Sequence, residues 1–217
     1  MAEQRWRERF SPSWLWRLPP SSGQVALTFD DGPLEGTTPS LLSELERLDI
    51  ISTHFLVGER AAAAPDLVRA IRDDGHEIAN HAFQHKSFLL RSAAYQRQSI
   101  LRAEEAIRRS CGATSWLYRP CFGQFNVWTQ GVLRRLNYTG VIWSLIAQDW
   151  IEQDDDELWQ RIRVRLHEGA IIVLHDGHPT TARVIRLLPR LADEVRTRGW
   201  NFVPLTPPAV NPPGKDT

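Results

Sequence analysis

The chain has 217 residues, of which 42% are hydrophobic and 24% are charged. This length suits one domain with a substantial core, and the composition is typical of a soluble globular protein. Lysine plus arginine and aspartate plus glutamate number 26 each, so no net charge attracts nucleic acid or an anionic membrane. No stretch approaches the roughly 20 apolar residues of a membrane span, which argues against an integral membrane protein.

The cysteines and the N-terminus bear on the cellular compartment. Cys111 and Cys121 give neither a disulfide framework nor a paired metal-binding motif, and a single bridge or two reduced thiols would both fit them. The basic, aromatic N-terminus contains only the short apolar patch Trp14-Leu15-Trp16, so it lacks the long apolar core of a secretory signal. We therefore expect a cytoplasmic protein, or an extracytoplasmic one if the chain shown has been trimmed.

Short apolar segments alternate with amphipathic segments along the chain. The expected elements, in chain order, are a strand over 25–29, a helix over 38–48, a strand over 52–57, a helix over 65–72, a strand over 77–80, a helix over 92–109, a strand over 116–118, a helix over 127–136, a strand over 140–144, a helix over 154–166, a strand over 170–174, a helix over 182–198 and a strand over 201–204. We expect Pro189 to kink or restart the last helix. About seven strand–helix units without an internal linker predict a single α/β domain.

Two adjacent carboxylates, Asp30 and Asp31, follow the first predicted strand and precede Gly32-Pro33, which stops that strand. Because two like charges side by side repel, we expect a metal ion, an arginine or a shared proton beside them. The structural alternative is an acidic turn that caps the next helix. If the strands close into a barrel, groups at their C-terminal ends converge on one face, where such enzymes place their chemistry.

Two histidines, His81 and His85, follow the third predicted strand. On a helical turn their spacing points both imidazoles the same way, as two ligands of one metal ion require. An isolated pair at this spacing is more often structural, but the acid pair earlier in the chain favours ligation. Two imidazole nitrogens and one carboxylate form a common open zinc site that keeps a position for water.

Three further polar residues, Arg119, Asp149 and His175, lie at the ends of later predicted strands. Arg119 is a fixed cation that can hold a carboxylate ionised, and the loop after it has backbone N–H groups that can face a developing oxyanion. A carboxylate near His175 would raise the pKa of its imidazole and keep it protonated. The structural alternatives are an arginine-capped surface turn and a histidine satisfied within the core.

Taken in order, these segments resemble the polysaccharide deacetylase family of metal-dependent carbohydrate esterases, which includes chitin and peptidoglycan N-deacetylases. The resemblance rests on five motifs: Thr28 to Pro33, His81 to His85, Arg119 to Gly123, Asp149-Trp150 and Val173 to His175. It implies a distorted (β/α)7 TIM-like barrel that forms a catalytic domain over 22–206, between an N-terminal extension over 1–21 and a Pro-rich tail over 207–217. It also implies a divalent metal ion, usually zinc, with Co²⁺, Ni²⁺ and Mn²⁺ as alternatives.

The resemblance assigns a role to each motif residue. The metal ligands would be Asp31, His81 and His85. The catalytic groups would be Asp30 as the general base on the metal-bound water, Arg119 as its anchor, His175 as the general acid and Asp149 as the carboxylate that orients it. The substrate site would be formed by Phe122, whose backbone N–H faces the oxyanion, and by Trp150, Val173 and Leu174, which wall the acetyl pocket.

Four positions depart from the usual family pattern. Ala82 replaces a Ser or Thr that could brace the ligand loop, Cys121-Phe122 replaces a common Pro-Tyr pair, and Ile146 stands where many relatives carry another acid. The lost hydroxyl next to His81 can weaken metal binding by about 10–100-fold. None of the changes removes a proposed catalytic group, so we expect activity and leave the choice of substrate open.

The predicted function is metal-dependent hydrolysis of an acetyl group from an N-acetylated sugar. The expected substrate is a glycan that contains N-acetylglucosamine, such as a chitooligosaccharide or peptidoglycan. One alternative is a hydrolase of another C–N bond, such as that of a cyclic imide or ureide. Another is a sugar-binding pseudoenzyme, which the presence of both Asp30 and His175 disfavours.

Overall fold

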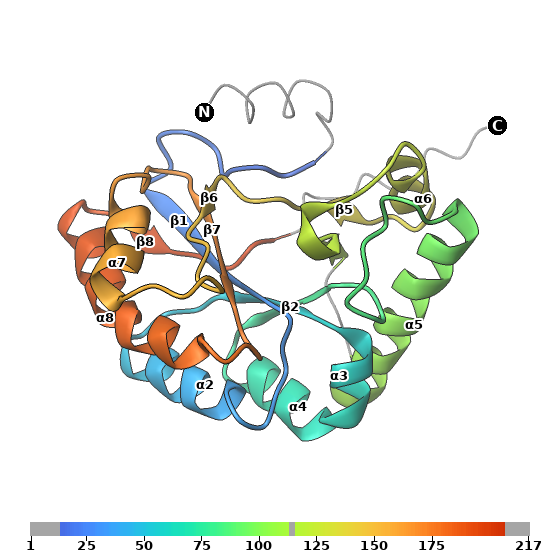
Figure 1. Cartoon of the computed structure of the whole chain (residues 1–217), viewed down its shortest axis with the longest axis horizontal. Helices are drawn as coiled ribbons and strands as arrows, with labels where there is room; N and C mark the ends of the chain where they lie inside the picture. Colours follow the sequence, from blue (N-terminus) through green and yellow to red (C-terminus); the bar gives the residue numbers. More distant parts are fainter. Residues whose placement is uncertain (1–13, 113–115, 207–217) are drawn as a thin grey trace.

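The computed structural model describes residues 14–112 and 116–206, which form a curled parallel sheet wrapped by helices (Figure 1). The strands are β1 (Gln24–Asp30), β2 (Thr53–Leu56), β3 (Glu77–Asn80), β4 (Leu117–Tyr118), β5 (Thr139–Gly140), β6 (Leu145–Ile146), β7 (Ile171–His175) and β8 (Asn201–Phe202). The helices are α2 (Thr38–Arg47), α3 (Gly58–Ala63), α4 (Pro65–Asp73), α5 (Ala93–Cys111), α6 (Thr129–Arg135), α7 (Asp155–Arg163) and α8 (Thr181–Thr197), with a 3₁₀ turn η1 (Cys121–Gly123).

Seven of these strands follow one path, β5-β4-β3-β2-β1-β7-β6, and β8 pairs with the beginning of β1. Neighbouring strands along the path run parallel. Within the described residues β5 and β6 lie at opposite ends of this path, so the barrel is not closed by a strand pair there. Seven parallel strands that curl into an open barrel with helices around them confirm the expected distorted (β/α)7 barrel.

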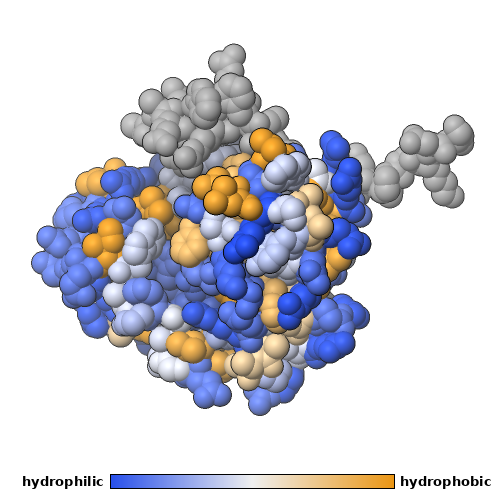
Figure 2. All heavy atoms as spheres, turned by 45° about the vertical axis from the view of Figure 1, so that its right-hand side comes forward, coloured by the Kyte–Doolittle hydropathy of each residue, from blue (hydrophilic) through white to orange (hydrophobic). Residues whose placement is uncertain are grey.

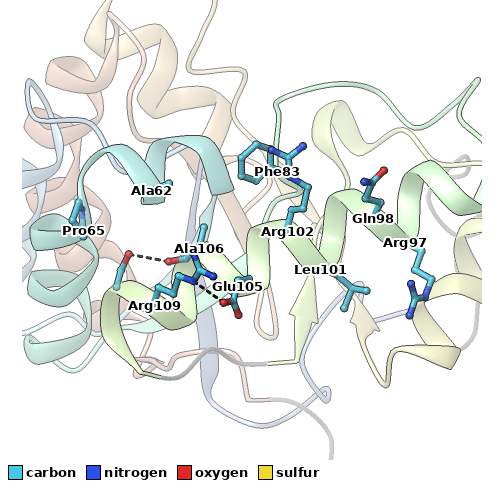
Figure 3. A pocket seen from close by; sticks show the side chains of 11 residues that line it. Ala62, Pro65, Phe83, Arg97, Gln98, Leu101, Arg102, Glu105, Ala106 and Arg109 are labelled. Atoms are coloured by element: carbon cyan, nitrogen blue, oxygen red, sulfur yellow. Dashed lines mark hydrogen bonds and ion pairs between the residues drawn. The ribbon is translucent and has the colours of Figure 1, made fainter.

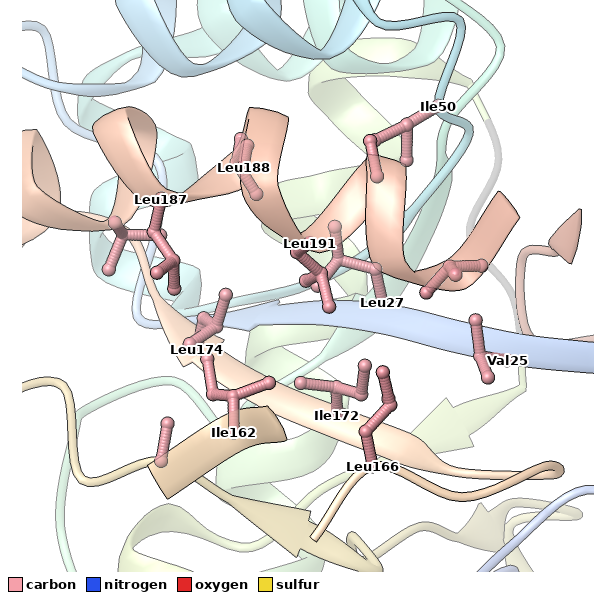
Figure 4. Close-up of a cluster of buried hydrophobic side chains, with 14 of the residues drawn as sticks. Val25, Leu27, Ile50, Ile162, Leu166, Ile172, Leu174, Leu187, Leu188 and Leu191 are labelled. Carbon is pink, nitrogen blue, oxygen red and sulfur yellow. The ribbon is translucent and has the colours of Figure 1, made fainter. Parts of the chain in front are cut away.

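The main hydrophobic core lies between β1, β7 and helices α2, α7 and α8 (Figure 4). On β1, Val25, Leu27 and Phe29 point into this core because alternate residues of a strand share a face. Helix α8 presents buried residues at helical spacing, namely Val184, Leu187, Leu188, Leu191 and Val195. This packing fixes the C-terminal ends of β1 and β7 side by side, where the candidate catalytic residues lie.

Two expectations about the elements are wrong. The single strand expected over 140–144 is instead divided into β5 and β6, and the residues between them cross from one end of the sheet path to the other. Leu15 bridges Val141 in parallel, and Trp14 packs so closely on Gly140 that a Cβ there would lie 2.5 Å from the indole. Of the two outcomes expected at Pro189, the restart is wrong, because α8 continues through the proline as one helix with core residues on both sides, whereas a kink there stays a prediction.

The ends and the surface complete the description. Trp14 and Trp16 are buried, whereas the tail expected over 207–217 lies outside the described residues. The domain boundaries expected after residues 21 and 206 stay predictions.

Figure 2 shows a face on which hydrophilic residues are mixed with small groups of apolar ones. In the part of the chain that is described, no helix combines the length and the apolar composition needed to cross a bilayer.

Candidate active site

The register of the sheet brings the candidate residues to one edge. Asp30 is paired with His175 across β1 and β7. Asn80 ends β3 and is paired with Tyr118 at the end of β4, so the loops that begin with His81 and Arg119 leave the sheet at the same level. The carboxyl ends of the parallel strands thus carry the predicted acid, base and metal-binding groups together.

Asp30 is held by a buried ion pair. The Nη1 atom of Arg119 donates to the Asp30 Oδ1 atom at 2.7 Å and to the Thr28 hydroxyl oxygen at 2.8 Å. The Arg119 side chain is fully buried, and its guanidinium lies 4.0 Å from the centre of the Phe55 ring. Burial lowers the pKa of Arg119, but the neighbouring Asp30 opposes this shift. The pair therefore holds the carboxylate in a fixed orientation with one oxygen engaged.

Asp31 faces the two histidines instead. Its Oδ1 atom lies 3.1 Å from Nε2 of His85 and 3.4 Å from Nε2 of His81. This oxygen is buried and has no hydrogen-bond partner among the described residues. Ligand atoms about 2.0–2.1 Å from one metal ion stand about 2.8–3.4 Å apart in octahedral or tetrahedral arrangements. Both Oδ1–Nε2 separations are therefore those of ligands that share a divalent cation. The Asp31 backbone at φ 76° is in the left-handed region, which turns its side chain away from that of Asp30.

The histidine loop is not the helical turn that we expected. Residues 81–87 form an irregular segment in which Ala82 has a φ of 66°. The Asn80 side-chain oxygen accepts from the Ala82 N–H at 2.8 Å, and the Gly58 N–H donates to the Ala82 carbonyl at 2.9 Å. These bonds replace the helical pattern and brace the loop without the hydroxyl that Ala82 lacks.

His81 is oriented by the arginine segment. Its Nδ1–H donates to the Arg119 carbonyl at 2.8 Å, so Nε2 is the ring nitrogen that is directed at Asp31. Such a bond from the far nitrogen is the usual support of a metal-binding imidazole. Arg119 thus positions one carboxylate through its side chain and one imidazole through its backbone.

The electrostatics of this cluster favour a positive charge. Burial raises the pKa of Asp31, but His81, His85 and His175 together bring it well below its usual range. Burial lowers the pKa of His81, while the neighbouring Cys121, Asp30 and Asp31 raise it well above its usual value. Burial lowers the pKa of His85 and favours its neutral form. The cluster therefore attracts a cation, whether a proton or a metal ion.

Asp149 and His175 form a second pair across from Asp30. One Asp149 oxygen accepts from the His175 ring Nδ1 at 2.9 Å and the other accepts from the His175 backbone N–H at 2.8 Å. Burial lowers the pKa of His175, but the hydrogen bond and charge of Asp149 raise it above its usual value. The raised pKa favours the protonated imidazole, in which the other ring nitrogen, Nε2, carries a proton that it can donate, as a general acid requires.

The predicted substrate residues are only partly brought together. The Phe122 ring lies 4.3 Å from that of His85, and the Trp150 ring lies 4.9 Å from that of His175. Val173 is nearly fully buried on the His175 face of β7. Leu174 points to the opposite face and lies in the core among Leu27, Ile162 and Leu187, so its expected place in the acetyl pocket is wrong (Figure 4).

Three supporting residues were not anticipated. Thr28 accepts from Arg119, and its place two residues before Asp30 on a strand was a usable signal. Asn80 holds the histidine loop, which its position at a strand end alone does not reveal. Asp176 is fully buried next to His175 and accepts from the hydroxyls of Thr37 and Thr38. Nothing in the spacing of these residues predicts that last network.

A groove of about 610 Å³ lies along helix α5 beside α3 (Figure 3). Phe83, from the loop between the two histidines, contributes to its wall, and the Arg102 guanidinium lies 3.7 Å from the centre of that ring. The lining contains none of the predicted catalytic or metal-binding residues. The groove is therefore separate from the candidate active site.

Comparison with known proteins agrees with the fold and the motifs. Residues 17–141 match the family described as Polysaccharide deacetylase. A chitooligosaccharide deacetylase from Bradyrhizobium sp. (strain ANU 289) is 32% identical over 195 residues, which cover 83% of this chain and 88% of the relative. The chain belongs to the polysaccharide deacetylase family, whose enzymes generally depend on a divalent metal ion.

Two solved structures have the same fold. The Bc1960 peptidoglycan N-acetylglucosamine deacetylase superposes with a TM-score of 0.85 at 28% identity and covers 89% of this chain and 91% of its own. A family 4 carbohydrate esterase from Streptomyces lividans, solved in complex with acetate, has a TM-score of 0.77 at 35% identity and covers 83% of this chain and 92% of its own.

Proposed function

We propose that the chain is a zinc-dependent deacetylase that hydrolyses the acetamido group of an N-acetylglucosamine-containing glycan. The observation that carries this proposal is that the two adjacent carboxylates have different partners. Asp30 is held by Arg119, whereas Asp31 directs an unpartnered oxygen at His81 and His85. These different partners suit a general base, Asp30, next to a metal ligand, Asp31, better than they suit an acidic turn.

The metal would be held by Asp31, His81 and His85. When bound, a divalent cation would lower the pKa of a coordinated water and polarise the acetyl carbonyl. The donor set of one carboxylate and two imidazoles suits zinc, which commonly keeps an open position with three protein ligands. Co²⁺, Ni²⁺ and Mn²⁺ are the alternatives.

The protein groups divide the proton transfers. Asp30 would accept a proton from the water that attacks the acetyl carbon, with Arg119 keeping the carboxylate aimed. The backbone N–H of Phe122 would donate to the oxygen on which negative charge develops. As the C–N bond breaks, His175 would give its proton to the leaving amine, and Asp149 would stabilise the imidazole throughout. The products are acetate and a free amino sugar.

The substrate class is supported by the relatives and by the rim of the site. The named relatives are a chitooligosaccharide deacetylase and a peptidoglycan N-acetylglucosamine deacetylase. The Phe122 side chain is 59% exposed and Trp150 is 37% exposed, so each offers an aromatic surface to a sugar ring. Trp150 packs against His175, and Val173 lies on the same face of β7 as His175. Together Trp150 and Val173 would form the wall around the acetyl methyl group.

The test is acetate release from chitooligosaccharides, peptidoglycan fragments and acetylated xylan, with added zinc and with a chelator. We expect chelator-sensitive release from a substrate that carries N-acetylglucosamine, and none from His81→Ala. Release from xylan alone would replace the N-acetyl substrate with an O-acetyl one. A zinc-loaded protein that releases no acetate from any of them would contradict the proposal and point to a small-molecule amide or to a binding role.

A further inference from the structure

Cys121 lies beside the two histidines that the zinc site uses. Its side chain is buried, with 1% of the residue exposed. Ligand atoms of Cys121, His81 and His85 all lie within 4.8 Å of one another. The thiol is thus one of three potential metal donors that converge on one place, rather than an isolated cysteine.

The Cys121 thiol is also fixed to the histidine loop. Its Sγ atom donates to the His81 carbonyl at 3.3 Å and lies 3.9 Å from the Gln84 carbonyl. These contacts hold the sulfur against the segment that carries both imidazoles. Cys121 itself begins the η1 turn directly after Pro120, so its backbone has little freedom to carry the sulfur away.

The two histidines therefore belong to two donor sets. One set adds the carboxylate oxygen of Asp31, which lies within 3.4 Å of both Nε2 atoms. The other adds the sulfur of Cys121, and Asp31 is not a member of it. Carboxylate oxygen suits hard cations, whereas thiolate sulfur selects soft ones. A cation that prefers sulfur thus has a reason to bind these imidazoles together with Cys121 rather than with Asp31.

We propose that Cys121 gives this centre a second coordination set, in which a soft divalent cation such as Cd²⁺ binds His81, His85 and the Cys121 thiolate and excludes zinc from the catalytic set. On binding, the thiol proton is released to solvent and no electron is transferred. The site is suited to a divalent cation because the Asp31 carboxylate lies beside both imidazoles, while the two nearby arginines are engaged elsewhere, Arg119 with the Asp30 carboxylate and Arg60 with the Asp31 carbonyl. The inference uses two residues of the proposed zinc site but does not depend on sugar deacetylation.

The test is a Cd²⁺ titration of the metal-free protein, followed by the ultraviolet sulfur-to-cadmium charge-transfer absorption. We expect a band that saturates at one cadmium per chain in the wild type. Cys111→Ser is the matched control and should keep the band, whereas Cys121→Ser should lose it. Asp31→Asn should also keep the band, because Asp31 lies outside the sulfur set. Zinc added in excess should diminish the wild-type band.

Each contrary result overturns the proposal. If the wild-type protein binds cadmium without the band, cadmium has no sulfur ligand. If Cys111→Ser loses the band, the sulfur ligand is Cys111 and not Cys121. Loss of the band in Asp31→Asn shows one joint donor set rather than two. If Cys121→Ser does not fold, as judged by circular dichroism, cadmium X-ray absorption of the unmodified protein counts the sulfur ligands directly. Failure of acetate release with zinc, by contrast, would leave every one of these readouts unchanged.

Discussion

Asp30 and His175 are paired residues on the adjacent parallel strands β1 and β7, and the Asp176 N–H donates to the Asp30 carbonyl at 2.8 Å. The proposed base and the proposed acid are therefore fixed to each other by the sheet rather than by a flexible loop. Each also has its own buried partner, Arg119 for Asp30 and Asp149 for His175. The hydrogen bond and charge of Asp149 raise the pKa of His175 against the effect of burial, as a group that must donate a proton requires.

Replacing the carboxylate that orients His175 should shift the pH dependence of the reaction. Asp149 raises the pKa of His175 against the effect of burial, so Asp149→Asn should lower that pKa. The general acid would then lose its proton at a lower pH, and the alkaline limb of the kcat/KM profile should move in that direction. At neutral pH the rate should fall by about 10²–10⁴-fold.

The measurement is the pH–rate profile of the zinc-loaded enzyme together with an NMR titration of His175. Glu152→Gln is the control, because the Glu152 side chain is 95% exposed and its removal changes only a nearby surface charge. An alkaline limb that stays in place in Asp149→Asn would show that His175 is not the acid.

Mutation should separate the proposed proton-transfer role of Asp30 from the proposed metal-binding role of His81. Asp30→Asn should abolish turnover and leave zinc bound, because Asp30 is engaged with Arg119 and lies outside the metal-ligand set. His81→Ala should lose both zinc and turnover, because it removes a ligand. Acetate release and equilibrium dialysis against zinc check the two effects. Retained activity in Asp30→Asn would reject Asp30 as the base.

The sequence predicts the site better than it predicts the supports of the site. Residues such as Asp30 and His175 are recognisable because a polar side chain ends an apolar strand, a pattern that folding alone explains poorly. The Leu174 error was avoidable, since Leu174 and His175 are adjacent on a strand and must point to opposite faces. Of the two bonds that replace the expected helical turn, the one from Asn80 to Ala82 is local, but the one from the Gly58 N–H of α3 joins distant parts of the chain, which local sequence does not encode.

The buried ion pair should make Arg119 more important for stability than surface arginines. Arg119→Met leaves the nearly buried Asp30 carboxylate without its partner, so it should cost about 3–5 kcal/mol of unfolding free energy. The double variant Arg119→Met, Asp30→Asn should recover part of that loss because no charge is left unpaired. Urea unfolding of the four proteins measures the coupling.

Arg47→Met is the control for this cycle. Arg47 pairs with Glu44 on the surface of α2, and its side chain is 60% exposed. Solvent screens such exposed pairs, so the control should unfold close to the wild type. If Arg119→Met and Arg47→Met lower the unfolding free energy equally, the buried ion pair contributes no more to stability than the exposed one.

Metal binding should stabilise the folded chain. Asp31, His81 and His85 come from two separate loops, so the unfolded chain does not present them together. Zinc at 100 times its Kd should add about 2.7 kcal/mol to the unfolding free energy, with a matching rise in Tm. Thermal unfolding with zinc and with a chelator tests this, and His81→Ala should show no zinc-dependent shift. A similar shift in His81→Ala would place the stabilising zinc elsewhere.

The last prediction concerns how the carboxylate of Asp176 supports the acid pair. A Cβ at Gly32 would lie 2.6 Å from the Asp176 Oδ2 atom, which accepts from the Thr38 hydroxyl at 2.5 Å. Gly32→Ala should therefore displace that carboxylate, break its bond to Thr38 and move the backbone next to Asp31. We expect a loss of about 1–3 kcal/mol in stability and weaker zinc binding.

Two further variants test this explanation against a simple effect of alanine. Asp176→Ala removes the clashing oxygen, so the double variant Gly32→Ala, Asp176→Ala should be less destabilised than the sum of the two single variants, because both act through one contact. Gly36→Ala is the matched control, since no atom lies within 4 Å of a Cβ built at that position. Strict additivity in urea unfolding would show that Gly32 acts independently of Asp176, and zinc affinity in the same proteins would show whether the contact reaches Asp31.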